Sequence, residues 1–191
     1  MPVRTPLLAV VSGPPATGKT TLARALAQRL GVPAVLRDEI KQGMVMNHPG
    51  HAPDGNDLLN VPTMEAFFAT LTVLLGAGTS VVAEAAFQDR LWRPGLEPLM
   101  KIADLRIIRC TTPTAAIAQR ITDRAHRDSH RAAHGDKALL ADMKAGLYDP
   151  DQFVPISLDA PNLLVDTSDG YMPGMAEIQR FVLRPDRKDA N

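Results

Sequence analysis

The sequence is poor in cysteine, in aromatic residues and in net charge, and each shortage argues against a class of protein. Cys110 is the only cysteine among 191 residues, so no disulfide forms within the chain. Its place in an apolar run predicts a buried thiol rather than a nucleophile. A lone thiol of this kind is typical of a reducing compartment, and we expect a cytoplasmic protein.

The balance of charge disfavours nucleic acid as a partner without excluding it. Lys and Arg together number 21, as do Asp and Glu, so the net charge is zero. Aromatic residues make up 4% of the chain. There is therefore no overall positive field to attract phosphate backbones, and there are few rings on which bases could stack.

Long hydrophobic runs are also lacking, although the chain is rich enough in apolar residues to build a core. No run approaches the roughly twenty residues of a membrane span, and the N-terminus has no leader pattern, so we expect a soluble, unexported protein with no membrane partner. With 45% hydrophobic residues, residues 1–184 are expected to form a single domain, and residues 185–191 a disordered tail. A monomer and a homodimer are equally compatible with this composition.

The most informative motif lies near the N-terminus, where residues 13–20 satisfy the Walker A pattern G-x-x-x-x-G-K-[ST]. Its glycines let successive backbone N–H groups point at phosphates, Lys19 supplies positive charge to the β and γ oxygens, and Thr20 offers a hydroxyl to Mg²⁺. An apolar strand precedes the motif and an amphipathic helix follows it, as this chemistry requires. The predicted nucleotide-binding residues here are Gly13, Pro14, Pro15, Ala16, Thr17, Gly18, Lys19, Thr20 and Thr21.

Short aliphatic runs alternate with helical patterns along the rest of the chain. This alternation predicts an α/β domain with a parallel sheet and helices on both faces. Functional residues in such sheets lie at the carboxyl ends of the strands. The expected strands cover residues 7–12, 33–37, 80–84, 105–110 and 162–166.

Asp38 follows the second expected strand and opens a helical pattern. Two roles are compatible with this position. The carboxylate could cap the helix by accepting a hydrogen bond from a first-turn N–H group. It could also act as the general base that takes a proton from a substrate hydroxyl during phosphoryl transfer.

Glu84 ends the third expected strand and is followed by apolar residues. An unpaired buried carboxylate is costly, so Glu84 needs a partner: Mg²⁺ or its water shell, a substrate hydroxyl, or an arginine. The structural alternative is an ion pair with Arg90 or Arg93. Arg90 is also a candidate substrate-binding residue.

Arginines and histidines recur between residues 119 and 134. Arg120, Arg124 and Arg127 share one helical face, which could simply be solvated. We favour a role for Arg120 and Arg124 in neutralising a transferring phosphoryl group, with stacking on adenine as an alternative for Arg120. A metal site built from His126, His130 and His134 is disfavoured, because no cysteine or acidic ligand completes it. Residues 47–60 predict a surface loop, either a lid or a plain insertion.

Together these segments resemble the small P-loop kinases, a group that includes chloramphenicol phosphotransferase, the kinase domain of polynucleotide 5′-hydroxyl kinases, gluconate kinase and the zeta toxins. The resemblance implies a P-loop NTPase three-layer sandwich with strand order 2-3-1-4-5 and a helical lid around residues 119–146. It also implies that Asp38 is the catalytic aspartate, that Arg120 and Arg124 belong to the lid, and that Thr167 lies near adenine. The matching segments are residues 13–20, 37–40, 81–87, 120–124 and 164–168.

The motifs and the resemblance predict an ATP-dependent phosphotransferase that moves the γ-phosphate of Mg-ATP to a hydroxyl of a small molecule. Lys19, Asp38, Arg120 and Arg124 are the candidate catalytic residues. Asp38 and Glu84 are candidates for substrate binding, and Thr20 and, through water, Glu84 for Mg²⁺. A polynucleotide 5′-hydroxyl kinase and a nucleotide-gated binding protein with weak ATPase activity remain alternatives. A GTPase is disfavoured because the chain has no Asn-Lys-x-Asp motif.

Overall fold

The computed structural model describes residues 4–48, 57–127 and 136–184. A five-stranded parallel sheet with the order β2-β3-β1-β4-β5 forms the centre of the molecule, as expected. The first and last strands match their predicted bounds. The second is shorter than predicted because Arg37 already belongs to the following helix. The strands are β1 (Leu7–Ser12), β2 (Ala34–Leu36), β3 (Val81–Glu84), β4 (Asp104–Thr111) and β5 (Asn162–Asp166).

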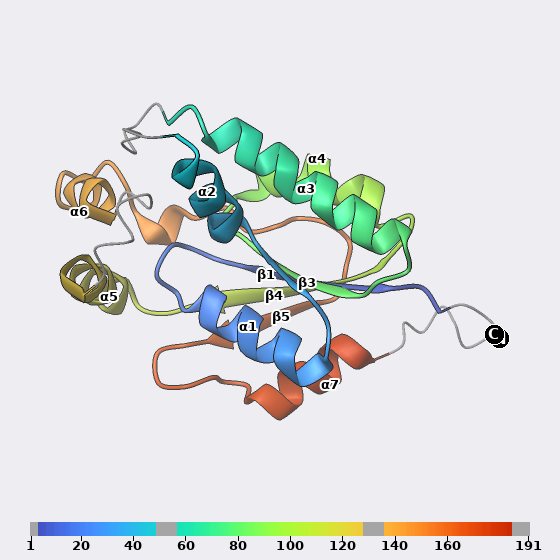
Figure 1. The fold of residues 1–191 in the computed structure, drawn as a ribbon. Helices are drawn as coiled ribbons and strands as arrows, with labels where there is room; N and C mark the ends of the chain where they lie inside the picture. The colour runs from blue at the N-terminus through green and yellow to red at the C-terminus, as the bar shows by residue number, and fades with distance from the viewer. Residues whose placement is uncertain (1–3, 49–56, 128–135, 185–191) are drawn as a thin grey trace.

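Helices cover both faces of this sheet (Figure 1). Helices α1 and α7 lie against one face, and α3 and α4 lie against the other. Helices α5 and α6 lie next to each other, beyond the edge of the sheet where β1 ends and the loop that follows β1 begins. The helices are α1 (Lys19–Leu30), α2 (Arg37–Met46), α3 (Asn60–Gly76), α4 (Asp89–Leu99), α5 (Thr114–Arg127), α6 (Asp136–Lys144), the 3-10 helix η2 (Pro150–Gln152) and α7 (Met175–Leu183).

Side-chain alternation along β1 explains the two layers of helices. Leu8 and Val10 pack into the core beneath α3 and α4, whereas Ala9 and Val11 pack into the core beneath α1 and α7. All four are buried. A strand covered on both faces reads as a continuous apolar run, and this is why the sequence pattern located β1 so well.

The strand register brings the functional ends of β1, β2 and β3 to one edge of the sheet. Glu84 is the register partner of Val11 on one side and of Leu36 on the other. The Walker A loop begins two residues after Val11, and Asp38 comes two residues after Leu36. Residues far apart in the sequence are thereby placed side by side at the carboxyl end of the sheet.

Cys110 confirms the prediction of a buried thiol. Its side chain is fully buried in β4, and this burial raises the pKa of the thiol to about 12. Within the described ranges, none of the helices combines the length and apolar character that a membrane crossing needs. Residues 49–56 of the predicted surface loop and the predicted tail at residues 185–191 lie outside the described residues.

Candidate active site

Residues 13–18 form a loop whose backbone only glycine can follow at its first position. Gly13 has a φ of 141°, and a Cβ atom there would lie 2.3 Å from the carbonyl oxygen of Cys110. Gly18 has a φ of 77° and caps the N-terminus of α1. The loop therefore turns back onto the start of a helix, where unpaired N–H groups and the helix dipole favour an anion.

Lys19, the first residue of α1, is buried against this loop, with 5% of the residue exposed. Its ammonium group donates a hydrogen bond of 2.8 Å to the carbonyl oxygen of Pro14, and it lies 4.0 Å from the Glu84 carboxylate. The hydroxyl of Thr17 donates to the same Pro14 oxygen at 2.8 Å. The positive charge is thus held against the loop rather than extended into solvent.

The buried carboxylate of Glu84 is partnered by other residues of the site. This agrees with the expectation that a buried carboxylate needs a partner. The residue is 3% exposed, and its Oε2 atom accepts a 3.0 Å hydrogen bond from the Thr20 hydroxyl. Burial raises the pKa of the Glu84 carboxyl; the Lys19 charge partly lowers it, and the Asp38 charge raises it further. Glu84, Lys19 and Asp38 therefore form one electrostatic cluster.

The alternative ion pairs of Glu84 with arginines are wrong. Arg93 instead pairs with Asp89 at 3.6 Å, within α4. Arg90 is exposed on the same helix and does not line the cavity described below, so the structure does not bring it together with the other candidate residues.

Asp38 lies in the first turn of α2 but does not cap it. The N-cap residue is Leu36, whose side chain makes no capping hydrogen bond. The capping role considered for Asp38 is therefore wrong. Its half-buried carboxylate instead forms an ion pair with Arg37, with 3.1 Å between Asp38 Oδ1 and Arg37 Nη1.

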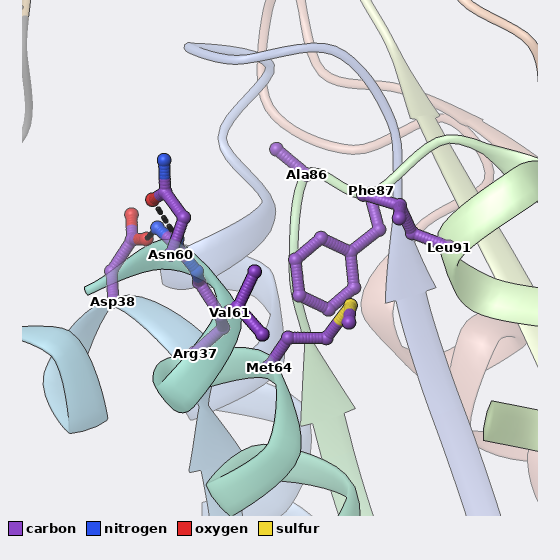
Figure 2. Close-up of a pocket in the computed structure, with 8 residues that line it drawn as sticks. All are labelled: Arg37, Asp38, Asn60, Val61, Met64, Ala86, Phe87 and Leu91. Carbon is purple, nitrogen blue, oxygen red and sulfur yellow. Dashed lines mark hydrogen bonds and ion pairs between the residues drawn. The ribbon is translucent and has the colours of Figure 1, made fainter. Parts of the chain in front are cut away.

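A cavity of about 330 Å³ opens beside Asp38 (Figure 2). Asp38, Arg37 and Asn60 lie on one side of it, facing Phe87 and Leu91 on the other. A larger cavity of about 540 Å³ lies between β5 and α7, and none of the candidate site residues line it. The lining residues of the cavity beside Asp38 are Arg37, Asp38, Asn60, Val61, Met64, Ala86, Phe87 and Leu91.

The sequence analysis did not predict the polar network that joins the residues on the polar side of this cavity. Asn60 Oδ1 accepts hydrogen bonds from Arg37 Nη2 at 2.7 Å and from Lys41 Nζ at 3.1 Å. Lys41 also forms a buried ion pair with Asp57, so the network joins α2 to the start of α3. The partners are at least sixteen residues apart, and no local pattern pairs them.

Arg120 extends from α5 to the candidate nucleotide loop. Its Nη2 atom donates to the carbonyl oxygen of Thr167 at 2.5 Å, and its Nη1 atom donates to that of Ala16 at 3.4 Å. The Thr167 hydroxyl in turn donates to the carbonyl oxygen of Thr17 at 2.7 Å. Arg120 and Thr167 therefore tie α5, the loop after β5 and the candidate nucleotide loop together.

The structure describes the remaining candidate residues between 124 and 134 only in part. The backbone at Arg124 and at His126 belongs to α5, but their side chains lie outside the described part of the chain. His130 and His134 lie wholly outside it.

The oxygen atoms beside Lys19 fit Mg²⁺. The Thr20 hydroxyl and the Glu84 carboxylate are hard oxygen donors 3.0 Å apart. Mg²⁺ typically takes one or two protein oxygens and completes its shell with water and phosphate. In the described stretches, no group of three or more His, Cys, Asp or Glu side chains could hold a metal.

Comparisons with known proteins identify the family of this chain. A family model described as an AAA domain matches residues 8–150. The uncharacterized protein Rv2004c of Mycobacterium tuberculosis is 30% identical over 143 residues, which cover 70% of this chain. The match spans only 29% of the length of that relative.

Solved structures share the whole fold. A candidate kinase from Chloroflexus aurantiacus has a TM-score of 0.81 and 27% identity, covering 94% of this chain and 97% of its own. The APS kinase of Mycobacterium tuberculosis, solved with AMPPNP and APS, has a TM-score of 0.60 and 16% identity, covering 94% of this chain and 99% of its own. The latter likeness concerns the fold alone.

Proposed function

Because this chain belongs to the AAA domain family and has the fold of the small P-loop kinases, we propose that it is an ATP-dependent phosphotransferase whose acceptor is a hydroxyl of a small molecule. One observation carries the proposal. Asp38 lines a cavity of ligand size and also lies close enough to Glu84, the hydrogen-bond partner of Thr20, to raise its pKa. A base placed between a phosphoryl donor and an acceptor pocket is what such a transfer needs.

The donor side of the reaction rests on residues 13–20. The N–H groups at the start of α1 and the Lys19 ammonium group would hold the β and γ phosphates of ATP. Thr20, together with Glu84 through water, would hold Mg²⁺, which neutralises charge on the phosphates when bound. The Lys19 charge is already fixed at the loop, so little reorganisation is needed when charge develops.

The acceptor side rests on Asp38. Its carboxylate would accept the proton of the acceptor hydroxyl while the hydroxyl oxygen forms a bond to the γ-phosphorus. The bond between that phosphorus and the β–γ bridging oxygen breaks, and ADP departs with the electron pair. Arg37 orients the Asp38 carboxylate through the 3.1 Å ion pair.

Arg120 and Arg124 are proposed to act from the lid formed by α5 and α6. Arg120 is anchored by the carbonyl oxygens of Ala16 and Thr167, beside the phosphate loop. A guanidinium group in this region would neutralise charge on the transferring phosphoryl group, and Arg124 follows one turn later on the same helix.

The first test is phosphate transfer from γ-labelled Mg-ATP to pooled alcohols by wild type and Asp38→Asn. We expect the variant to keep its ATP affinity and to lose turnover by about 10²-fold or more, because the amide cannot accept the proton. Glu39→Gln is the matched control: Glu39 is the next acidic residue, exposed and paired with Arg24 on the surface. It should retain full turnover.

Two results would reject the proposal, and a third would change its mechanism. Transfer only to 5′-hydroxyl oligonucleotides, with strong dependence on salt, would indicate a polynucleotide kinase. Label reaching only water, equally in wild type and Asp38→Asn, would indicate a nucleotide-gated binding protein. Unchanged transfer by Asp38→Asn would remove Asp38 as the base.

A further inference from the structure

We propose that the acceptor is an uncharged amphipathic alcohol, whose apolar body lies along Phe87, Met64 and Val61 while its hydroxyl meets Asp38. This inference rests on the proposed phosphotransferase activity and adds to it the chemical class of the acceptor. It follows from two properties of the cavity beside Asp38: one wall is apolar, and its charges are already paired.

The cavity is predominantly apolar on the side that faces Asp38. Of the eight residues that line it, five are hydrophobic, and they come from α3, from the segment after β3 and from α4. Phe87 packs edge-on against Trp92, with ring centroids 5.4 Å apart, so its ring is held firmly as a wall. Figure 2 shows the Phe87 ring and the Met64 side chain opposite the polar groups.

This wall disfavours a polyol such as a sugar. Each hydroxyl that turned toward Phe87 or Met64 would lose its hydrogen bonds to water and find no partner on that wall. An apolar body placed there would instead remove its own surface and that of the wall from water. The cavity volume of about 330 Å³ lies at the small end of the range for ligand pockets.

The charges around the cavity disfavour an ionic acceptor. Among its described lining residues, Arg37 is the one cation and Asp38 the one anion, and they pair with each other at 3.1 Å. Arg37 also donates to Asn60, and its guanidinium carbon lies 5.9 Å from the centre of the Phe87 ring. Lys41, the nearest further cation of this network, is bound to Asp57 and Asn60.

An anionic acceptor could reach the buried Arg37 Nε, which has no hydrogen-bond partner among the described residues, but it would compete with Asp38 for the Arg37 charge and weaken the ion pair that positions the base. A cationic acceptor would have to compete with Arg37 for the Asp38 carboxylate. A neutral acceptor leaves the pair undisturbed, with the carboxylate available to a hydroxyl.

The test uses three probes that differ in one property each: 3-phenylpropane-1,2-diol, its anionic counterpart 3-phenyllactate, and glycerol, which has no ring. Binding to the full chain is measured by titration calorimetry in the presence of Mg-AMPPNP. We expect the phenyl diol to bind at least about tenfold more tightly than either of the other probes.

A matched pair of variants locates the binding on the apolar wall. Val61 and Val73 lie on α3 and are 59% and 70% exposed, but only Val61 lines the cavity. Val61→Asp should weaken binding of the phenyl diol by about tenfold, because it places a charge against the apolar body, and Val73→Asp should leave it unchanged. Both sites are exposed enough for the variants to fold.

The inference is overturned if 3-phenyllactate or glycerol binds as tightly as the phenyl diol, if the diol does not bind, or if both variants behave alike. Phosphate transfer is measured separately with the same probes. Preferred transfer to 3-phenyllactate would support the kinase activity and reject the neutral acceptor. Tight, Val61-dependent binding of the diol without any transfer would support the pocket and reject the kinase.

Discussion

Among the described glycines, Gly13 is the one at which an added Cβ atom would come closest to another part of the backbone. Its φ of 141° and the 2.3 Å approach of a would-be Cβ to Cys110 oxygen leave no room for a side chain. Gly13→Ala should therefore displace the phosphate loop, abolish nucleotide binding and lower the midpoint of urea unfolding.

Gly43 provides the matched control. It lies inside α2, and a Cβ atom there would meet nothing within 4 Å. Gly43→Ala should leave nucleotide binding unchanged and raise the free energy of unfolding by about 0.5–1 kcal/mol. Normal nucleotide binding by Gly13→Ala would contradict the loop geometry.

The buried carboxyl of Glu84 is expected to make the free energy of unfolding depend on pH. Burial raises the pKa of its carboxyl in the folded protein above the usual value of 4.5, so the folded state holds the proton more tightly than the unfolded state. The contribution of Glu84 to stability is then largest below pH 4.5 and falls as pH rises through the raised pKa. Relative to Glu84→Gln, wild type should lose stability as pH increases.

The measurement is urea unfolding of wild type and Glu84→Gln at a series of pH values from about 4 to about 8. A constant difference in free energy of unfolding across this range would show that the Glu84 pKa is not raised. A difference that grew in favour of wild type with pH would show that it is lowered.

Lys41 of α2 forms a buried ion pair with Asp57, which lies three residues before the start of α3. Lys41→Met should lower the free energy of unfolding by about 3–5 kcal/mol, because the Asp57 carboxylate would remain buried without its ion-pair partner. Arg24→Ala is the control: Arg24 pairs with Glu39 of α2 on the exposed surface, and its loss should cost less than about 1 kcal/mol.

Equal costs for the two variants, measured by urea unfolding, would show that the Lys41 pair is no more important than a surface pair. The same network reaches Arg37 through Asn60. If Lys41→Met remains folded, we therefore expect it to shift the Asp38 side chain as well and to reduce phosphate transfer.

Helix α5 connects the phosphate loop to α6 through a small apolar cluster. Ile117 and Ile121 are buried against Ala16 of the loop, and Leu139 and Met143 of α6 pack against them. A movement of α5 and α6 would therefore displace the phosphate loop, because the cluster packs against Ala16. This contact supports the proposal that α5 and α6 act as a lid over the phosphate loop.

At the scale of the whole molecule, one sheet separates two cores that share its strands. Trp92, the only tryptophan, reports on the core beneath α3 and α4, and Leu26 of α1 lies in the opposite core. Because β1 contributes to both, we expect the molecule to unfold as one cooperative unit.

Leu26→Ala should therefore lower the stability reported by Trp92 fluorescence by about 2–5 kcal/mol, although the two residues lie in different cores. Leu164→Ala, at a largely exposed position on the edge strand β5, should have a much smaller effect. A Trp92 transition that ignored Leu26→Ala while circular dichroism shifted would show that the two faces unfold separately.

The sequence alone determined the features that depend on local pattern. Strands β1 and β3 were predictable because strands buried on both faces are continuous apolar runs, and the parallel sheet was predictable because strands alternate with helices. The phosphate loop was predictable because its backbone demands glycine at Gly13 and Gly18. That Glu84 needs a partner also followed from the apolar residues around it.

Only the tertiary structure decided which residues contact one another. It paired Glu84 with Thr20 rather than with an arginine, and it moved Asp38 from the cap of α2 into the first turn. It also built the cavity from segments on either side of residues 49–56 and joined α2 to α3 through buried polar contacts. These outcomes depend on distances between residues far apart in the chain, which are set by packing and strand register rather than by any local propensity.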